Sequence, residues 1–306
     1  MTIVILGSKG QVGSLIANAI KKKFSIHNLF NIKILEVDRT SFDLLDYQSL
    51  NKFIIKNMPQ IIVNAAAYTK VDKAETEHNL AYLVNTNLVE FLANTCSKLN
   101  ITLLHISTDY VFDGNQSKPY RESDIANPIG IYGKTKFDGE NSIKAICKKF
   151  IILRTSWVFG LNGENFVKTM IKLGNKNEKL RVVNDQYGAP TSANAIAETI
   201  AEILFRLKDS SSDDNKWGIY HFSGYPYVSW AEFARKIFNL AKDIQLLDKE
   251  ISIDQVKAQD FKTIAKRPYN SKLDCFKIKE VFDINPDKWE KSLEDFLCDM
   301  KKTNKQ

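Results

Sequence analysis

The sequence contains no hydrophobic run of the ~20 residues that a membrane-spanning helix needs. Its beginning enters a short apolar stretch without the charged and apolar regions of a secretory signal. The four cysteines form neither a CxxC pair nor a metal-ligand spacing. These absences predict a cytoplasmic protein with reduced thiols, no membrane partner and no cysteine-based metal site.

The chain also has no internal repeat and no basic stripe interleaved with aromatic residues, the pattern typical of nucleic-acid binding. Its net charge of +7 comes from lysines spread along the sequence, and such a surface attracts an anionic cofactor or sugar nucleotide. With 306 residues, 44% of them hydrophobic, the chain can bury one large core or two smaller ones. We therefore expect a globular protein that binds small anionic molecules and no nucleic acid.

A glycine-rich segment follows the first predicted strand. Residues 3–6 are apolar, as in a strand buried on both faces, and a helical pattern begins after Gly13. Gly7 permits a tight turn, Gly10 lets the backbone approach a pyrophosphate, and Gly13 lets the helix pack close to the strand. The N–H groups at the start of the helix can bind phosphate. The spacing is GxxGxxG rather than GxGxxG, so taken alone it also fits a structural turn.

Two further segments stand at the ends of predicted strands, where parallel sheets bind ligands. Strand 32–37 ends in Asp38 and Arg39. The carboxylate can accept hydrogen bonds from the adenosine ribose, whereas the guanidinium can bind the additional phosphate of NADP. The small residues 65–67 follow the third strand and allow either a flat ligand or a closely packed helix. The expected cofactor is therefore NADPH or NADH, with neither strongly excluded.

Strands and helices alternate up to about residue 156, which predicts an α/β fold with a Rossmann-type doubly wound parallel sheet over residues 1–156. Within it, apolar positions at helical spacing over residues 80–92 predict one long core helix. Beyond that point the elements become shorter and mixed. We expect a smaller mixed α/β substrate domain over residues 157–302, with a strand near 218–223 that could return to the first sheet.

Tyr132 and Lys136 are four residues apart, so on a helix their side chains lie one turn apart on one face. An ammonium in that position should lower the pKa of the tyrosine and make it a usable acid at neutral pH. Thr108 ends the fourth predicted strand, where its hydroxyl can bind a substrate oxygen beside Tyr132. A Tyr-x-x-x-Lys pair is common by chance, so its meaning depends on the predicted dinucleotide site.

Together these segments resemble the extended short-chain dehydrogenase/reductases, and the resemblance covers nearly the whole chain. Three motifs are more specific to one branch of that family: Arg-Thr-Ser-Trp-Val at 154–158, Asn-Asp-Gln-Tyr-Gly-Ala-Pro-Thr at 184–191 and Arg-Pro-x-Asn-Ser at 267–271. The branch implies NAD(P)H-dependent reduction of the C4 keto group of dTDP-4-dehydro-L-rhamnose to dTDP-L-rhamnose. The implied partner is thus a dTDP-sugar substrate.

The resemblance also implies roles for individual residues. Tyr132 would donate a proton to the C4 carbonyl, Lys136 would hold the nicotinamide ribose, and Thr108 would bind the substrate near C4; these are the expected catalytic residues. The expected cofactor-binding residues are Gly7, Gly10, Gln11, Val12, Gly13, Asp38, Arg39, Asp43, Leu44, Ala65, Ala66, Ala67, Tyr68 and Thr69, with Tyr132 and Lys136. The expected substrate-binding residues are Thr108, Asp109, Tyr110, Trp157, Asn165 and Arg267. A guanidinium suits the substrate diphosphate, which is the role expected of Arg267.

Some features depart from the family or leave alternatives open. Certain members dimerise around a divalent cation held partly by an acid on the first helix, but here that helix opens Ser14-Leu15-Ile16. We therefore predict no such metal and leave a homodimer open. Sister dehydratases carry a second acid where this chain has Tyr110, which argues against dehydration. Asp43 could simply cap a helix. An epimerase, a reductase of another 4-keto sugar nucleotide, and a non-catalytic regulatory homologue remain alternative functions.

Overall fold

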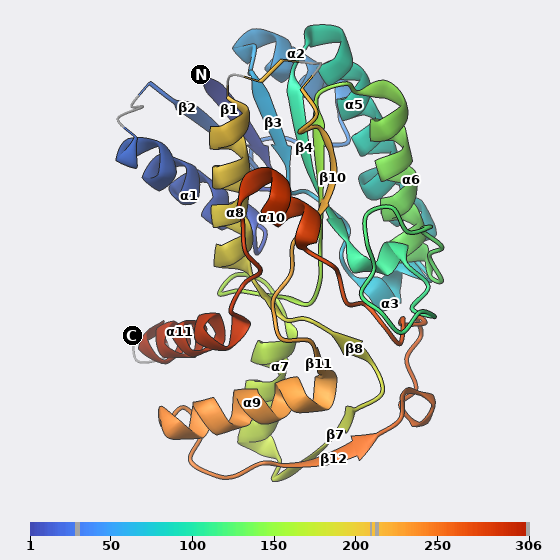
Figure 1. The fold of residues 1–306 in the computed structure, drawn as a ribbon, viewed down its shortest axis with the longest axis vertical. Helices are drawn as coiled ribbons and strands as arrows, with labels where there is room; N and C mark the ends of the chain where they lie inside the picture. Colours follow the sequence, from blue (N-terminus) through green and yellow to red (C-terminus); the bar gives the residue numbers. More distant parts are fainter. Residues whose placement is uncertain (28–30, 209, 212–213, 304–306) are drawn as a thin grey trace.

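The computed structural model describes residues 1–27, 31–208, 210–211 and 214–303. Figure 1 shows a central sheet with helices on both faces and, below it, a smaller group of helices and short strands. All neighbouring strands of the central sheet pair in parallel, in the order β10-β5-β4-β3-β1-β2. These strands are β1 (Thr2–Leu6), β2 (Lys33–Val37), β3 (Ile61–Asn64), β4 (Thr102–Thr108), β5 (Phe150–Thr155) and β10 (Gly218–His221). The predicted α/β class with a doubly wound parallel sheet is confirmed.

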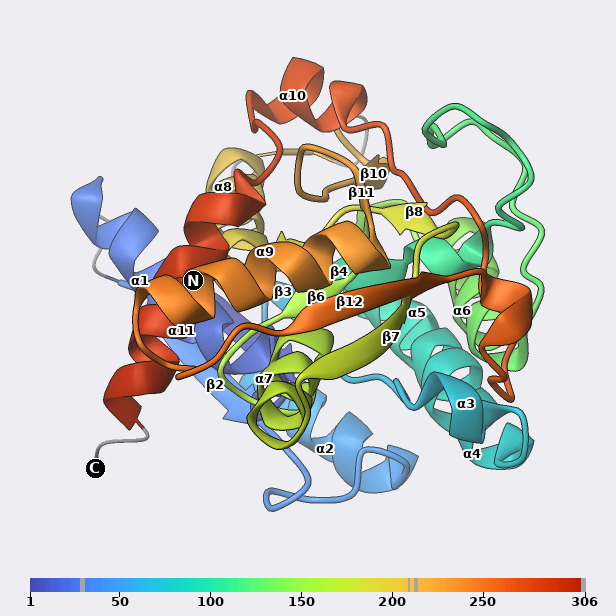
Figure 2. The ribbon, with the colours of Figure 1, turned by 90° about the horizontal axis from the view of Figure 1, so that it is seen from below.

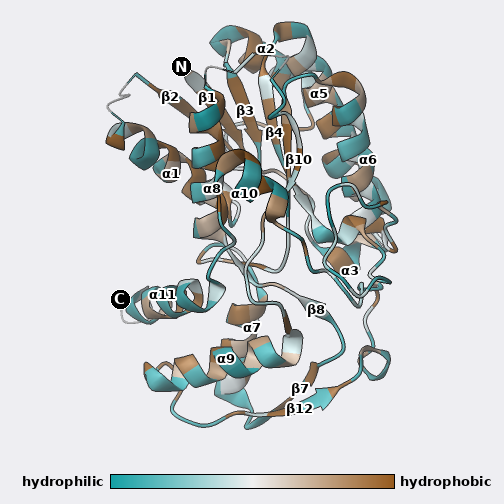
Figure 3. Ribbon diagram, viewed as in Figure 1, coloured by the Kyte–Doolittle hydropathy of each residue, from teal (hydrophilic) through white to brown (hydrophobic). Residues whose placement is uncertain are grey.

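Two hydrophobic cores lie on opposite faces of this sheet. Because side chains alternate along a strand, Ile3 and Ile5 of β1 enter one core while Val4 and Leu6 enter the other. Figure 3 shows the central strands as mainly hydrophobic. The first core is covered by α1 (Gly13–Ile26), α8 (Ala193–Leu207) and α10 (Phe276–Phe282). The second is covered by α2 (Tyr47–Asn57), α5 (Leu88–Leu99) and α6 (Ile131–Ile146).

The second half of the chain returns to the central sheet through α8 and β10. β10 pairs with β5 and forms one edge of the sheet. Two side chains block its outer edge: Glu122 accepts a hydrogen bond from the backbone N–H of His221 at 2.8 Å, and Lys277 donates to the carbonyl of Ile219 at 2.7 Å. Satisfying these backbone groups prevents another strand from pairing with the edge.

The helix predicted over residues 80–92 is interrupted. The chain forms α3 (Val71–Ala74), α4 (His78–Tyr82), a π-helical turn (Leu83–Asn87) and then α5. The wider turn shifts the face that looks inward, and the side chain of Asn85 uses it to reach the core. Its amide bonds both the N–H and the carbonyl of Tyr68, and it donates to the hydroxyl of Thr135 at 3.1 Å. Leu80 and Leu83 remain 42% and 40% exposed, so the prediction that they belong to the core is wrong.

The smaller group of elements has its own hydrophobic core, in which Phe159, Phe233 and Trp289 are buried. Figure 2 shows α9 and β12 crossing this part of the molecule. Its helices are α7 (Phe166–Lys176), α9 (Trp230–Asp243) and α11 (Trp289–Thr303). Its strand pairs are β7 (Lys179–Val183) with β12 (Ser252–Val256), β6 (Val158–Phe159) with β9 (Thr191–Ser192), and β8 (Tyr187–Gly188) with β11 (Val228–Ser229). Strands of two residues carry no periodicity and could not be predicted.

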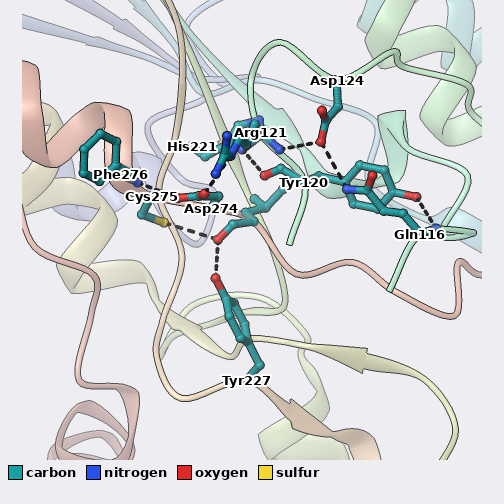
Figure 4. Close-up of polar contacts among 10 residues, drawn as sticks. Gln116, Tyr120, Arg121, Asp124, His221, Tyr227, Asp274, Cys275 and Phe276 are labelled. Carbon is teal, nitrogen blue, oxygen red and sulfur yellow. Dashed lines mark hydrogen bonds and ion pairs between the residues drawn. The ribbon is translucent and has the colours of Figure 1, made fainter. Parts of the chain in front are cut away.

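The loop before α6 is tied to the chain before α10, as Figure 4 shows. The N–H of Tyr120 donates to the carbonyl of Lys272 at 2.8 Å, and the N–H of Asp274 donates to the carbonyl of Tyr120 at 2.7 Å. Arg121 and Asp274 form an ion pair at 3.3 Å. These contacts bring the loop containing Arg267 next to the start of the helix that carries Tyr132.

Candidate functional site

A cleft of about 680 Å³ opens at the carboxyl ends of β1, β2 and β3. Many of the predicted cofactor residues line it: Gly7, Gly10, Asp38, Arg39, Asp43, Leu44, Ala65, Ala66 and Ala67. Sequence reasoning missed the other lining residues: Lys9, Thr40, Leu45, Leu80, Val84 and Leu88. Apolar spacing assigns Leu80 and Val84 to a core helix. Leu80 instead lines the cleft and is 42% exposed, whereas Val84 lines the cleft and also packs against the buried cluster that contains Ala81.

The glycine-rich turn at the floor of this cleft fits a dinucleotide. Gly7 has φ of 79°, and a Cβ there would lie 2.7 Å from the backbone nitrogen of Ala66. A Cβ on Gly13 would lie 2.1 Å from the carbonyl oxygen of Gly7, so helix α1 packs as closely as predicted. Val12 precedes α1 and makes no side-chain cap. The N–H groups of Ser14 and Leu15 donate to the carbonyls of Gly10 and Val12 at 3.1 and 2.9 Å, so what α1 offers an anion such as a pyrophosphate is chiefly the positive end of the helix dipole.

Asp38 lies at the mouth of the cleft and already has partners. Its carboxylate accepts hydrogen bonds from the N–H and hydroxyl of Thr40, and it pairs with the ammonium of Lys9 at 3.0 Å. These contacts lower the pKa of Asp38 to about 2, and the hydrogen bond with the side chain of Thr40 has the largest effect. Sequence reasoning missed Lys9 by treating it as a spacer between glycines, although a lysine inside a phosphate-binding turn is itself a signal. Asp43 accepts from the N–H of Leu45 at 3.0 Å.

Tyr132, near the start of α6, lies partly buried beside Thr108 at the end of β4. Burial, with a smaller effect from the charge of Asp109, raises the pKa of Tyr132 to about 12, and a hydrogen bond with Thr108 offsets part of this rise. The predicted lowering of this pKa by Lys136 is therefore wrong. The Nζ of Lys136 instead donates to the carbonyl of Ile106 at 2.7 Å and lies 3.0 Å from Nε2 of His105.

Two predicted substrate residues, Tyr110 and Asp109, lie next to Tyr132, and a third, Arg267, interacts with Tyr110. The ring of Tyr110 meets the Tyr132 ring edge-on at 5.5 Å between centroids. Arg267 pairs with Asp72 at 2.8 Å and interacts with the hydroxyl of Tyr110. Asp109 is 2% exposed, and burial raises its pKa to about 7. One of its carboxylate oxygens bonds Thr108, but the other, Oδ2, has no hydrogen-bond partner among the described residues. The site therefore holds an unused buried acceptor.

Trp157 stacks face to face on Trp230, with ring centroids 3.4 Å apart and an angle of 7° between the planes. Its backbone has φ of 46°, a conformation that side chains rarely adopt. Its Nε1 donates to the hydroxyl of Ser271 at 3.2 Å, and that hydroxyl donates to the carbonyl of Tyr187 and lies near Asp109. Ser271 thus links Trp157 to Asp109, while Trp230 packs against the ring of Trp157. The motif at 267–271 contained a signal for Ser271, whereas nothing in the sequence marked Trp230.

Asn165 lies against the glycine-rich turn. Its amide donates to the side chain of Gln11 at 3.0 Å and to the carbonyl of Gly160 at 2.7 Å. Its carbonyl oxygen accepts from the N–H of Lys168 and so caps α7. These contacts connect the smaller group of elements to the cofactor turn, while a contact of Asn165 with the sugar stays a prediction. Tyr68 bonds Glu77 through its hydroxyl at 2.6 Å.

Over the described part of the chain, no group of three or more His, Cys, Asp or Glu side chains is placed to hold a metal ion. None of the helices described there is long and apolar enough to cross a membrane.

The parallel sheet, the glycine turn and the cleft at its carboxyl edge define a Rossmann-type dinucleotide-binding protein. Residues 1–302 match the family model described as the RmlD substrate binding domain. With its relatives, this match shows that the chain belongs to the dTDP-4-dehydrorhamnose reductase family.

The relatives match over almost their full length. A dTDP-4-dehydrorhamnose reductase of Aggregatibacter actinomycetemcomitans is 40% identical, over 95% of this chain and 96% of its own. The crystal structure of one from Clostridium acetobutylicum is 33% identical and superposes with a TM-score of 0.86, covering 98% of this chain and all of that one. Another, from Bacillus anthracis in complex with NADP, is 33% identical with a TM-score of 0.84, over 97% and 99% of the two chains.

Proposed function

We propose that this protein, an extended short-chain dehydrogenase/reductase, reduces the C4 keto group of dTDP-4-dehydro-L-rhamnose to dTDP-L-rhamnose with NADPH or NADH. The observation that carries the proposal is the partly buried Tyr132, whose hydroxyl is held beside Thr108 at the carboxyl edge of the sheet that also forms the dinucleotide cleft. The names of the relatives and the NADP bound to one of them support the same reaction.

Different residues of the cleft would hold different parts of the cofactor. The start of α1, with Gly7 and Gly10, suits the pyrophosphate. Asp38 and its partner Lys9 suit the adenosine ribose and any phosphate on it. When bound, a reduced nicotinamide supplies the hydride for the reaction. The protein must supply orientation, a proton and a site that excludes water.

Tyr132 is suited to deliver that proton. Its pKa of about 12 keeps the hydroxyl protonated at neutral pH, so the acid is present before substrate arrives. The carbonyl oxygen becomes strongly basic as C4 is reduced, and it can then take the proton from Tyr132. Thr108 bonds the same hydroxyl and can hold the carbonyl oxygen in line with it.

The remaining substrate contacts would come from the residues around Tyr132. The free Oδ2 of Asp109 can accept a hydrogen bond from a sugar hydroxyl. Arg267 can bind the diphosphate once it exchanges its contact with Asp72 for the ligand. The stacked rings of Trp157 and Trp230 offer an apolar wall that limits access of water.

We also propose a cytoplasmic location. The four cysteines of the chain are free thiols, the state that a reducing compartment maintains.

Turnover of dTDP-4-dehydro-L-rhamnose with NADPH, followed by loss of the reduced-nicotinamide absorbance, tests the proposed reaction. NMR of the product should show dTDP-L-rhamnose and one cofactor oxidised per sugar reduced. The C4 epimer as the main product would contradict the assigned stereochemistry. Sugar isomerisation without net oxidation of cofactor would instead identify an epimerase.

A further inference from the structure

Behind the proposed catalytic residues, three buried polar side chains form a continuous chain between β3, β4 and α6. Asn64, His105 and Lys136 are each at most 1% exposed. The amide nitrogen Nδ2 of Asn64 lies 3.0 Å from Nδ1 of His105, and Nε2 of His105 lies 3.0 Å from Nζ of Lys136. The sequence does not predict these contacts, because Asn64 and His105 stand there only as residues of two separate strands.

The orientation of Asn64 fixes the direction of this chain. Its carbonyl oxygen Oδ1 accepts a hydrogen bond from the backbone N–H of Ala66 at 3.1 Å. The amide nitrogen must therefore face His105, and an amide nitrogen can only donate. It follows that Nδ1 of His105 is the acceptor and that the ring proton of neutral His105 is on Nε2.

This tautomer has a consequence for Lys136. The Nε2–H of His105 points at Nζ, so Nζ must accept a hydrogen bond, which an ammonium cannot do and an uncharged amine can. The amine also donates to the carbonyl of Ile106 at 2.7 Å. A charged Lys136 would instead need a proton on Nδ1, facing the amide of Asn64. Turning that amide would then place its NH₂ against the N–H of Ala66, so each charged arrangement leaves two donors opposed.

We propose that Asn64 and His105 hold Lys136 as an uncharged amine in the free enzyme, and that Lys136 takes up one proton from solvent when an anionic dinucleotide enters the cleft. The inference rests on the proposed function, because it concerns the same cleft and the same lysine. Ala65 and Ala66, which line the cleft, directly follow Asn64 in the chain. The negative charge of the dinucleotide favours the ammonium, and this outweighs the opposed donors.

The electrostatics around Lys136 agree with the hydrogen-bond pattern. Burial lowers its pKa from 10.5 to about 7, and the charge of Glu140, one turn along α6, offsets part of this change. Glu140 is already paired with Arg154 of β5 at 2.6 Å and accepts from Ser107 of β4. Burial also lowers the pKa of His105, which keeps the ring neutral.

Two further ionisable groups lie at the adjoining site, Tyr132 on α6 and Asp109 after β4. An uncharged Lys136 does not favour the phenolate, so Tyr132 remains protonated in the free enzyme. This suits a reductase, in which the tyrosine must give a proton and not take one. Proton uptake by Lys136 would then accompany cofactor binding and not precede it.

The first test is made on the free enzyme. Nitrogen-15 NMR of histidine-labelled protein reports the tautomer of each ring, and His105→Phe identifies the signal of His105 among the four histidines. We expect the Nε2–H tautomer for His105 in the wild type. In Asn64→Asp the new carboxylate accepts from Nδ1–H, so the proton should move to Nδ1. A wild-type ring protonated on Nδ1 would overturn the proposal.

The second test measures protons taken up on binding NADPH, by calorimetry at pH 8 in two buffers with different heats of ionisation. The wild type should take up close to one proton per site, and the dissociation constant should rise with pH, approaching tenfold per unit. Uptake should disappear in Asn64→Asp and in Lys136→Met, while the matched control Lys134→Met, an exposed lysine on the same helix, should keep it.

The outcomes separate this inference from the proposed function. NADPH binding without proton uptake in the wild type would overturn the inference alone, as would uptake that persists in Lys136→Met. A protein that binds neither NADPH nor NADH would overturn the proposed function. If Asn64→Asp does not fold, the wild-type tautomer and the comparison of Lys136→Met with Lys134→Met decide the matter.

Discussion

The carboxylate of Asp38 lies 3.0 Å from the ammonium of Lys9, and both groups line the cleft at the carboxyl edge of the sheet. An unpaired acid in this position would repel the additional phosphate of NADPH. Here Lys9 and the adjacent Arg39 offset that repulsion, while the acid can still accept from a ribose hydroxyl. Since the pair is accessible to solvent and salt, neither tendency should dominate.

We therefore expect the enzyme to use NADH and NADPH with kcat/KM values within roughly a hundredfold, or about 2.7 kcal/mol. Asp38→Ala should shift the preference toward NADPH, whereas Arg39→Ala and Lys9→Ala should each shift it toward NADH. The check is kcat/KM for both cofactors in all four proteins. A wild-type preference well above a hundredfold would show that one residue dominates.

Tyr132→Phe should lower turnover by about 10²–10⁴-fold, the usual contribution of a positioned acid. The ring still packs, so the dissociation constant for NADPH should change little. Tyr225→Phe is the matched control. Tyr225 is 61% exposed, so this variant should keep its turnover. Near-normal turnover of Tyr132→Phe would remove the tyrosine from its proposed role.

Lys136→Met should change the pH dependence of stability. The pKa of Lys136 is about 7 in the folded protein, against 10.5 for a lysine exposed to water, so the unfolded chain binds more protons between these values. The lysine therefore makes the free energy of unfolding rise with pH over that window. Lys136→Met should lose this rise. Its free energy of unfolding should exceed that of the wild type by the largest amount at pH 7 and below. Urea titrations at several pH values measure the free energy of unfolding of both proteins. If this free energy changes with pH in the same way in the two proteins, the result would argue against a buried amine.

Lys136→Met should also lose turnover and bind cofactor more weakly, if the lysine holds the nicotinamide ribose. Titration of NADPH by fluorescence gives the dissociation constant independently of activity. Unchanged affinity would remove the ribose role and leave only the effect on chemistry.

Trp157→Ala should raise the dissociation constant of the sugar nucleotide more than that of NADPH. Its ring is joined to Asp109 through Ser271 and stacks on Trp230, next to the proposed sugar site. Calorimetric titration of each ligand measures the two effects. General loss of folding, with equal effects on both ligands, would make Trp157 a structural aromatic only.

Arg154→Met should destabilise the fold by about 3–5 kcal/mol, because it leaves Glu140 as an unpaired buried carboxylate. Arg154 is 2% exposed and Glu140 is fully buried, with their side chains joined at 2.6 Å. Arg206→Met, which breaks an exposed pair with Glu202, should cost less than about 1 kcal/mol. Denaturant unfolding of both variants makes the comparison, and equal losses would contradict it.

The sheet was predictable because each central strand is a short apolar run followed by a turn and an amphipathic helix. The break in the helix over residues 80–92 was not, since apolar spacing cannot show that Asn85 turns inward to bond Tyr68. The pairs of two-residue strands were also beyond prediction, because they depend on which distant loops meet.

Within the site, the glycine turn and Asp38 were predictable because local spacing determines what they do. Tyr132 and Lys136 share a helix face as expected, but the partner of Lys136 comes from a strand some thirty residues earlier. A four-residue spacing says which side chains are neighbours on one helix and nothing of what the sheet presents to them. The spacing also does not show the burial that raises the pKa of Tyr132, so that pKa was predicted in the wrong direction.

β10 is the last strand of the central sheet to be synthesised, and this order has a consequence for the nascent chain. The ribosome releases β1 to β5 well before residues 218–221, so the outer edge of β5 has no partner during this interval. The apolar stripe of α1 that contacts α8 is uncovered for much of the same time. A nascent chain at this stage exposes strand edge and apolar surface together, which is what chaperones bind and what aggregates. Premature stop codons before residue 218 should therefore yield insoluble fragments.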